Sequence, residues 1–512
     1  MRTITLFLFA ALAVTSVDAA SYEQTDGTIV DPILDVQGNV LSYSGNNLEP
    51  HANLAGADLS NADLNYAHLA STNLTSTNLT SANLTSANLI NAVLTDANLS
   101  SADLESADLR TAHLINTTLI NADLTGAQMW GATLTGATLT GATLRGSTIT
   151  ESQFVSAASV TGVNLTGHTM SGWDLSGVDL TGATLTSATL TSADLQGATL
   201  TDANLNGANL SGADLTGVRS GGIVGTPSAL PSNWQITRSH LVGPHANLTD
   251  ALLNHSDLTG ADLNGAILKR ADLRYSDLTG VDLSYSNLYE GYLVGAKLDG
   301  ANLQGALLRG ADFGGATLTG ADLTSAKLGA AKLYVADLTS ATLSGAILTS
   351  AHLQGAILTG VDLSGSTITE SQFLSAASVT GVNLTGHTMS GWDLSGVDLS
   401  GATLTGADLT GAVLNDANFL EASLNGADLT GAQMWGADLS GADLSDSDFT
   451  NVAYYNDATW TNAFYDYRNE PTWGSGMDAA WRSSVGIQTI PEPAALLLAL
   501  LGLALLPRRR RR

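Results

Sequence analysis

The order of apolar and polar residues along the chain follows a period of five. In residues 57–61 (Ala-Asp-Leu-Ser-Asn) and 321–325 (Ala-Asp-Leu-Thr-Ser), only a leucine and the alanine two places before it are apolar. The pattern runs from about Ala52 to Phe449, with one long interruption. A helix would place apolar residues three and four apart, and a half-buried strand would alternate them. The period therefore predicts a repeat solenoid whose chain turns a corner every five residues.

These repeats resemble those of the pentapeptide repeat family. The resemblance implies an all-β fold, a right-handed quadrilateral β-helix with four repeats per coil and with the leucine and the small residue pointing inward. Elementary packing agrees, because leucine fills a narrow interior and stacked coils about 4.8 Å apart pair their backbone groups. Gly, Asn, Asp and Ser suit the corners because they form local turns.

The predicted inward residues are five positions apart along the chain, so any departure from this spacing can be located. After Phe154 and again after Phe373 the next inward residue comes one place late, and each slip lies in one copy of a near-verbatim duplication. A slip that is copied with its surroundings predicts a built bulge at a corner. We expect the widened corner to accommodate Trp173 and Trp392, which replace the usual inward alanine, as packing residues rather than as a ligand site.

The repeats form two arrays, residues 52–217 and 246–451, with a predicted looped interruption at 218–245. Prolines in the interruption lack the backbone donor that a regular ladder needs. We expect the flanking apolar residues to continue the stack while residues 225–234 loop out.

Both ends of a solenoid need a cover, because an open coil exposes unpaired backbone groups. Residues 20–51 are predicted to be an N-terminal cap segment. Residues 452–488 are predicted to be an aromatic C-terminal cap, because aromatic residues replace the five-residue spacing there. A sugar-binding module is the alternative interpretation of these aromatic residues.

Residues 1–19 have a basic start, an apolar run and a small-residue cleavage site, which together predict a secretory signal peptide. At the other end, a Pro-Glu-Pro motif precedes the apolar run 494–506 and a terminal basic cluster. The motif and the cluster consist of Pro491, Glu492, Pro493, Arg508, Arg509, Arg510, Arg511 and Arg512.

This arrangement resembles the PEP-CTERM sorting signal of exopolysaccharide-producing bacteria. For residues 489–512 the resemblance implies a short transmembrane segment, processing by an exosortase and transient contact with the membrane. We therefore expect a secreted protein that reaches the cell envelope or the extracellular space after C-terminal processing. A plain C-terminal anchor is the alternative.

The amino-acid composition argues against several kinds of binding site and catalytic site. The chain has no cysteine, so disulfides and thiolate metal sites are excluded. It carries 47 acidic and 19 basic residues, and a net charge of -28 argues against nucleic acid as a partner. Most acidic residues precede the central leucine, where the repeat already explains them, and the nine histidines follow no catalytic motif. We predict no enzyme activity, no catalytic residues, no cofactor and no metal site.

One column of acids leaves an alternative open. Asp262, Asp282 and Asp322 are separated by multiples of twenty residues and would stack in a coil of four repeats. Stacked carboxylates supply the oxygen ligands that calcium prefers, so weak calcium binding is the alternative to solvated acids.

One basic patch departs from the acidic background. Lys269, Tyr289 and Arg309 are twenty residues apart and would stack, with further cations and tyrosines nearby. Aromatic faces beside cations can hold an anionic polysaccharide by stacking and charge pairing, whereas the alternative is an ordinary solvated face. The candidate polysaccharide patch consists of Lys269, Arg274, Tyr289, Tyr292, Arg309, Lys327 and Lys332.

These observations predict a non-catalytic, exported structural or adhesive protein of the cell surface or extracellular matrix, a rigid β-solenoid associated with acidic exopolysaccharide. The alternative is an acidic DNA mimic that binds a DNA-handling protein such as gyrase, as some cytoplasmic pentapeptide repeat proteins do. The predicted export signals argue against that alternative, and fold alone does not transfer a function. The oligomeric state is not predicted.

Overall fold

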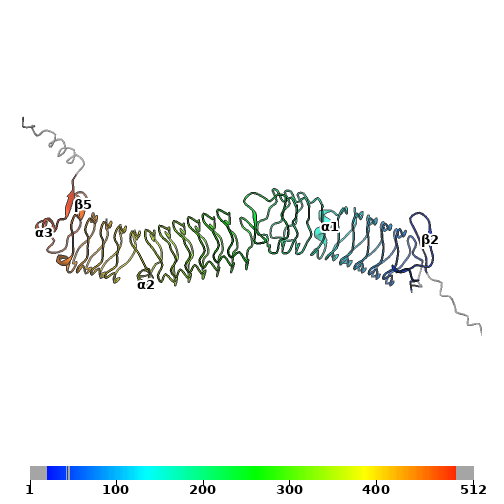
Figure 1. The fold of residues 1–512 in the computed structure, drawn as a ribbon, viewed down its shortest axis with the longest axis horizontal. Coiled ribbons are helices and arrows are strands. Elements are labelled where there is room, and N and C mark those ends of the chain that lie inside the picture. Colours follow the sequence, from blue (N-terminus) through cyan, green and yellow to red (C-terminus); the bar gives the residue numbers. More distant parts are fainter. Residues whose placement is uncertain (1–19, 42, 44–46, 492–512) are drawn as a thin grey trace, which may run out of the picture. The chain divides into compact units, whose positions relative to one another are not determined.

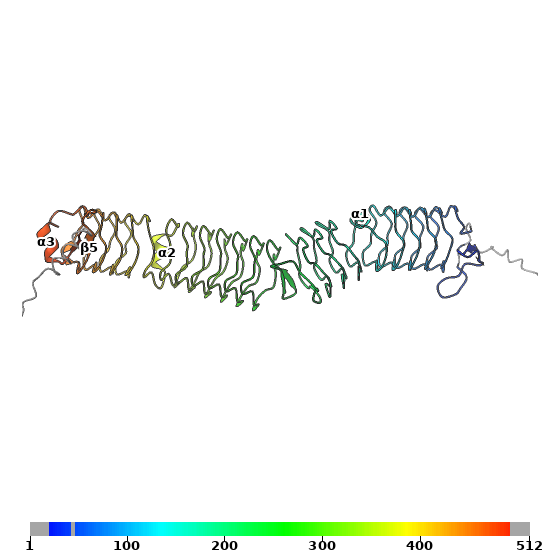
Figure 2. The ribbon, with the colours of Figure 1, turned by 90° about the horizontal axis from the view of Figure 1, so that it is seen from above.

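The computed structural model describes residues 20–41, 43 and 47–491. The chain divides into two compact units, Met1–Ser232 and Asn233–Arg512. Each unit is a stack of coils (Figures 1 and 2), and each coil pairs in parallel with the coil twenty residues further on. The predicted signal peptide and residues 492–512 lie outside the described residues.

One coil of unit 1 illustrates how the five-residue pattern builds the fold. Ala82 and Leu84 are fully buried, whereas Asn83 between them points outward and pairs with both neighbouring coils, at Asp63 and Asp103. The Leu84 amide donates to the Asp103 carbonyl at 2.7 Å. Burial of leucine and alanine repeats through both arrays, so the prediction that they form the interior is confirmed.

Each corner lies two residues after the inward leucine, where the backbone is left-handed. Ser86 has φ 55° there, a conformation that favours glycine, asparagine, aspartate and serine over branched residues. The residue before the leucine stabilises the same turn: Asp58 Oδ1 accepts a hydrogen bond from the Ser60 amide at 3.1 Å. The frequent acidic residues therefore have a structural task in the turn.

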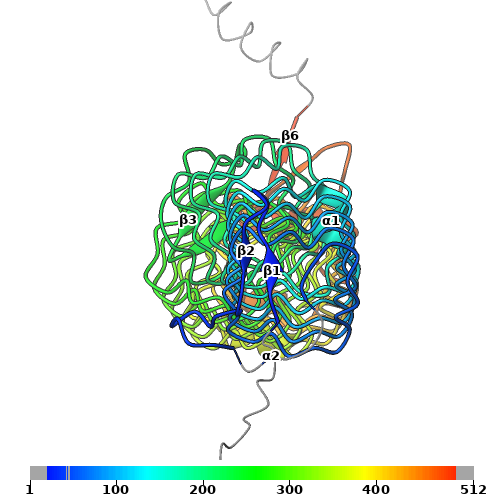
Figure 3. The same cartoon turned by 90° about the vertical axis from the view of Figure 1, so that its right-hand side faces the viewer.

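Each five-residue side contributes one residue to the ladder, so extended strands occur only outside the repeats. In unit 1, β1 (Tyr22–Glu23) pairs antiparallel with β2 (Ile29–Val30) at the start of the stack (Figure 3). The same segment covers part of the first coil, because the His68 amide donates to the Glu23 carbonyl at 2.7 Å. This contact satisfies backbone groups that an open end would leave unpaired.

The predicted register slip is confirmed, but its predicted form is wrong. The ladder offset changes from twenty to twenty-one residues at Thr138 and Ser159 in unit 1. The extra residue is accommodated by a short helix, α1 (Glu151–Ser156), rather than by a β-bulge. The copied slip in unit 2 contains α2 (Glu370–Leu374) in the same way.

A buried glutamine explains why a helical turn is stable at this corner. Gln153 Nε2 in α1 donates to the carbonyls of Met129 at 2.6 Å and Ala132 at 2.8 Å. Its Oε1 accepts from the amide of Thr150 at 2.8 Å, immediately before the helix. The glutamine thus satisfies the Ala132 carbonyl, which the displaced ladder would leave unpaired, and adds a second donor to the Met129 carbonyl, which also accepts from the Ala132 amide at 3.0 Å.

The predicted interruption is shorter than expected. In unit 1 the ladder continues through Val224 and Ala229, and the carbonyl of Thr226 accepts from Gly207 at 2.7 Å. The expected loop over residues 225–234 is therefore wrong for its first half. Proline cannot donate to a ladder, but the carbonyls of its neighbours still accept, so the chain remains on the last coil.

Unit 2 opens with a hairpin and ends in an aromatic cluster. Strands β3 (Gln235–Thr237) and β4 (His240–Val242) pair antiparallel before the repeats resume. After the last repeat come η1 (Tyr455–Asp457), β5 (Phe464–Asp466), α3 (Ala479–Ser484) and β6 (Gln488–Ile490), which pairs in parallel with β5.

The aromatic cluster packs against the last inward residue of the array. Phe449 stacks on Trp473 at 5.5 Å between ring centroids and meets the edge of buried Trp460 at 5.6 Å. The Arg482 guanidinium lies 4.8 Å from the Trp473 ring centroid. Among the described residues, no helix has the length and apolar character needed to cross a membrane.

Candidate functional site

Four of the seven predicted patch residues line one surface hollow in unit 2. The hollow has a volume of about 510 Å³ and is called here the cation hollow. Its lining consists of Lys269, Asn287, Tyr289, Leu307, Arg309, Lys327, Gly329 and Ile347.

The residues of the cation hollow come from successive coils. Asn287, Leu307, Lys327 and Ile347 form one column, in which each residue pairs in parallel with the next. The second column lies two positions further along each coil and contains Lys269, Tyr289, Arg309 and Gly329. A side chain that reaches the hollow is therefore placed there by the twenty-residue coil rather than by a local motif.

The floor of the cation hollow is apolar. Leu307 and Ile347 are 37 % and 40 % exposed, although they occupy the position before the inward leucine, where polar residues are usual. Gly329 has no side chain to fill the gap beside them, and a Cβ there would meet no atom closer than the Thr349 oxygen at 3.7 Å. Tyr289, 39 % exposed, adds an accessible aromatic ring between Lys269 and Arg309 in its column.

Three cations of the hollow have no ionic partner in the part of the chain that the structure describes: Lys269, Arg309 and Lys327. Other cations of unit 2 do have one. The neighbouring ion pairs are Arg270 with Asp250 at 2.8 Å, Arg274 with Asp272 at 2.7 Å, Lys297 with Asp277 at 3.4 Å and Lys332 with Asp312 at 3.2 Å. Three cations without an ionic partner among the described residues are therefore grouped at one hollow.

The structure does not bring the other three predicted residues into the cation hollow. Tyr292 lies on the next side of the coil, in one column with Asp272 and Asp312. Arg274 forms two hydrogen bonds to Asp272, which lower the pKa of that carboxyl and keep it ionised. Lys332 pairs with Asp312, so both cations are already neutralised.

Sequence reasoning missed the apolar floor. The missed lining residues are Asn287, Leu307, Gly329 and Ile347. A signal was present, since Leu307 and Ile347 replace the usual polar residue before the inward leucine and are forty residues apart.

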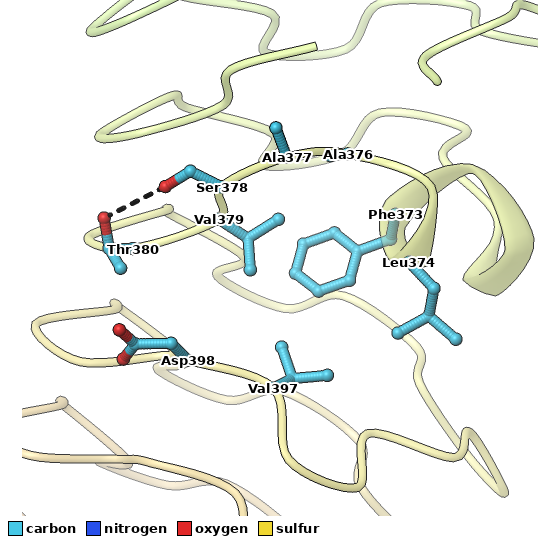
Figure 4. A pocket seen from close by; sticks show the side chains of 9 residues that line it. All are labelled: Phe373, Leu374, Ala376, Ala377, Ser378, Val379, Thr380, Val397 and Asp398. Carbon is cyan, nitrogen blue, oxygen red and sulfur yellow. Dashed lines mark hydrogen bonds between the residues drawn. The ribbon is translucent and has the colours of Figure 1, made fainter. Parts of the chain in front are cut away.

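A second hollow lies beside α2 (Figure 4), with a copy beside α1. Phe373, Val379 and Val397 give it an apolar lining next to Asp398. Asp398 is engaged already, because Oδ1 accepts from Asn418 Nδ2 at 2.9 Å and from the Ser400 amide at 3.1 Å. These donors are neutral, so the carboxylate keeps its negative charge, and the lining of this hollow contains no cation for an anionic ligand.

The tryptophans of the two widened corners pack as the sequence predicts. In unit 2 the ring centroid of Trp392 lies 6.0 Å from that of Phe373 and 5.7 Å from that of His387. Burial lowers the pKa of His387, because the charged imidazolium would lose its hydration there. His168, Phe154 and Trp173 repeat the arrangement in unit 1.

The acidic column of unit 2 is paired with amides. Asn233 Nδ2 donates to Asp262 Oδ2 at 3.0 Å, and Asn302 Nδ2 donates to Asp282 Oδ1 at 3.1 Å. Within the described ranges, no group of three or more acidic or histidine side chains is placed to hold a metal ion. Of the sorting-signal residues, only Pro491 is described, so the structure does not test that signal.

Solved structures of several repeat proteins are similar to parts of this chain. HetL from the cyanobacterium Nostoc sp. strain PCC 7120, involved in heterocyst differentiation regulation, is 34 % identical over 42 % of this chain and 91 % of its own, with a TM-score of 0.27. A pentapeptide repeat protein from the thylakoid lumen of Arabidopsis thaliana is 35 % identical over 18 % of this chain and 66 % of its own, with a TM-score of 0.16.

Another similar structure is QnrB1, a plasmid-mediated fluoroquinolone resistance protein. It is 20 % identical over 48 % of this chain and 97 % of its own, with a TM-score of 0.12. No curated protein matches the sequence significantly.

The family model for pentapeptide repeats matches both arrays and together covers more than half of the chain. The matched residues are 52–89, 77–114, 112–150, 156–191, 185–219, 246–284, 296–333, 336–373, 374–411, 393–431 and 407–446. Twenty-residue coils with buried leucine and alanine at the repeat positions agree with this match. The chain is a β-helix solenoid that belongs to the pentapeptide repeat family.

Proposed function

We propose that this protein is a non-catalytic structural or adhesive protein that binds acidic polysaccharide through the cation hollow. The observation that carries the proposal is the meeting of three unpaired cations, an exposed tyrosine and an apolar floor on an otherwise acidic protein. Pentapeptide repeat proteins are in general non-enzymatic, which supports a binding role.

The hollow matches the chemistry of an acidic sugar. The C–H face of a pyranose packs against an aromatic ring or an aliphatic floor, here Tyr289, Leu307 and Ile347, and its carboxylate pairs with a cation. Exposed ion pairs contribute about 0.2–1 kcal/mol each, so three cations give a moderate affinity that depends on salt. The acidic surface elsewhere repels a polyanion and directs it to this hollow.

Charge reversal in two matched sets tests the proposal. The hollow set is Lys269→Glu, Arg309→Glu and Lys327→Glu, and the control set is Arg274→Glu, Lys297→Glu and Lys332→Glu. Both sets change the net charge equally, but the control cations are already ion-paired. We expect the hollow set to lose retention on immobilised alginate about tenfold or more, and the control set to lose much less, since about 1.4 kcal/mol corresponds to tenfold.

Equal losses in the two sets would indicate general charge attraction without a site. Unchanged retention of the hollow set would refute the proposal. Circular dichroism of each variant verifies that the coils remain folded.

We also propose that the solenoid is a right-handed quadrilateral β-helix whose end segments act as caps, so that it forms a rigid spacer. Support comes from backbone hydrogen bonds that link the coils within each unit, as between the Leu318 amide and the Asp337 carbonyl at 2.7 Å. Each coil touches only its neighbours, so deletion of exactly twenty residues inside one array should preserve folding. Deletion of about twelve residues should not, because it breaks the five-residue register of the inward leucines.

Export and C-terminal processing by an exosortase remain part of the proposal, with delivery to the cell envelope or the extracellular space. The support is the sequence of the two ends, residues 1–19 and 489–512. Cell fractionation of the full chain and of a variant that lacks residues 491–512 tests it. Surface or medium localisation that depends on these residues is expected, whereas cytoplasmic protein would favour the gyrase-binding alternative.

A further inference from the structure

The surroundings of the cation hollow differ in charge along the stack and around the coil, because an acidic column flanks the hollow on the side that precedes it. Ladder pairing places Asp262, Asp282 and Asp322 in one column together with Asn302, on the side that precedes the hollow. On the side that follows, Asp272 and Asp312 share a column with Tyr292 and Lys332, and each is ion-paired, with Arg274 and Lys332 respectively. A polyanion lying around the girth of the coil would therefore meet the acidic column on the preceding side and ion pairs without net charge on the following side.

Along the stack the same hollow presents no carboxylate. The successive positions of its two columns are Lys269 on one coil, Asn287 and Tyr289 on the next, Leu307 and Arg309 on the third, Lys327 and Gly329 on the fourth, and Ile347 on the fifth. Coulomb repulsion on the preceding side and attraction along the columns both favour a ligand that lies parallel to the stack, since the ion pairs on the following side add no net positive charge.

The spacing of the charges specifies the ligand further. Coils in parallel register are about 4.8 Å apart, so Lys269 and Arg309, two coils apart, have backbones about 10 Å apart. The ring of Tyr289 lies on the coil between them. Lys327 lies one coil beyond Arg309, so these two cations can share one carboxylate.

We propose that the cation hollow binds a linear acidic polysaccharide lengthwise. Two acid groups of the polymer, separated by one intervening sugar, pair with Lys269 and with the Arg309 and Lys327 couple. The intervening sugar packs on Tyr289. This inference rests on the proposed function and specifies its ligand: an extended polymer with acid groups presented on alternate sugars.

Hyaluronan oligosaccharides, which carry one carboxylate for every two sugars, test the spacing. Binding of the disaccharide, tetrasaccharide and hexasaccharide to the full chain is measured by isothermal titration calorimetry at low salt. The tetrasaccharide has two carboxylates and should bind at least tenfold more tightly than the disaccharide. Neutral chitin oligosaccharides of the same length should bind at least tenfold more weakly than the tetrasaccharide.

Two single substitutions test whether Lys269 makes the affinity depend on the length of the oligosaccharide. Lys269→Ala should reduce the affinity for the tetrasaccharide to about that for the disaccharide, because only one end of the hollow remains charged. The matched control Lys297→Ala removes a cation that is already paired with Asp277 and should leave the tenfold preference intact.

The direction of the ligand is tested at the acidic flank. Asp282→Asn and Asp322→Asn together remove two charges while keeping a side-chain acceptor for the turn. A lengthwise ligand should gain affinity by the same small factor for the disaccharide and the hexasaccharide. A selective gain for the hexasaccharide would show that the chain crosses the flank, and would overturn the lengthwise orientation.

The outcomes separate this inference from the function on which it rests. If the disaccharide binds as tightly as the hexasaccharide and both lose affinity in the Arg309→Ala variant, the hollow is a single-charge site. The proposed function then stands and the lengthwise inference fails. If no acidic oligosaccharide binds and alginate is not retained, the proposed function fails as well.

Discussion

Two glycines of unit 2 separate two contributions to stability: the free-energy cost of an alanine in a left-handed corner, and the cost of displacing an aromatic ring. Gly295 and Gly300 both have φ +65°, in successive corners of the stack. A Cβ at Gly295 would lie 2.6 Å from the Tyr275 ring, whereas a Cβ at Gly300 would have no atom within 4 Å. Replacement of each glycine by alanine is therefore the same backbone change in two different surroundings.

The magnitudes follow from these contacts. Alanine in a left-handed conformation costs about 1–2 kcal/mol, which is the full expected effect of Gly300→Ala. Gly295→Ala also displaces Tyr275, whose ring stacks on His255 with centroids 5.2 Å apart. Loss of an aromatic pair costs about 0.5–1.5 kcal/mol, so Gly295→Ala should destabilise the local coils by about 1 kcal/mol more than Gly300→Ala.

Native-state hydrogen exchange measures this difference, because opening of a repeat array is local and a single unfolding free energy is not defined for it. The amides of Tyr275 and Gly295 bond to the next coil, to the Val294 and Gly314 carbonyls, each at 3.0 Å. A difference of about 1 kcal/mol makes their exchange about fivefold faster in the Gly295→Ala variant than in the Gly300→Ala variant.

Combining Gly295→Ala with Tyr275→Ala completes a double-mutant cycle for these two residues. In a Tyr275→Ala background the ring is absent, so Gly295→Ala should cost no more than Gly300→Ala. Equal exchange in the two single variants would refute the reasoning, because it would show that Tyr275 moves aside without loss. Gly300→Asn should be close to neutral, since asparagine already occupies such corners at φ 57° in Asn91.

Three further predictions concern the widened corner of unit 2. Burial lowers the pKa of His387 in the folded protein. The stabilising contribution of His387 is therefore fully present above the unfolded-state pKa of about 6.5 and is lost as the pH falls through the lowered folded-state pKa. His387→Asn should flatten the pH dependence of Trp392 fluorescence between about pH 7 and 5. Ser366→Ala should stabilise the corner by about 1 kcal/mol, measured as slower native-state amide exchange there, because this buried hydroxyl has no partner among the described residues. Ser276→Ala should destabilise its own coil by a similar amount, because its hydroxyl donates to the Leu273 carbonyl. Faster exchange in both variants would contradict the argument. Gln372→Leu should destabilise α2 by about 1–3 kcal/mol, visible as faster amide exchange there, since the buried Ala351 carbonyl loses its donor, whereas the Leu348 carbonyl keeps the Ala351 amide. Unchanged exchange would mean that water replaces the side-chain amide.

Much of the fold was predictable because the repeat is short and each position has one role. Leu84 and Ala82 are buried as expected, and the extra residue after Phe154 was visible as a one-place delay. The form of that insertion was not predictable, because the stability of α1 depends on Gln153 reaching carbonyls more than twenty residues earlier. A local pattern does not contain such a contact.

The candidate site was predictable only in part. Stacking at twenty residues correctly grouped Lys269, Tyr289 and Arg309. It also included Lys332, which the structure shows paired with Asp312, the residue twenty places earlier. The twenty-residue period determines which residues share a face of the solenoid. The net charge that a ligand meets on that face depends on which side chains pair across neighbouring coils.

The sequence by itself determined the period of five, the inward leucines and the polar corners, because hydrophobic burial and turn propensity act on each repeat in the same way. Only the tertiary structure decided where unpaired charge remains. Lys269, Arg309 and Lys327 lack ionic partners among the described residues because the coils place Leu307, Gly329 and Ile347 beside them instead of carboxylates. Ion pairing depends on atoms brought together from different coils, which is information that a single repeat does not carry.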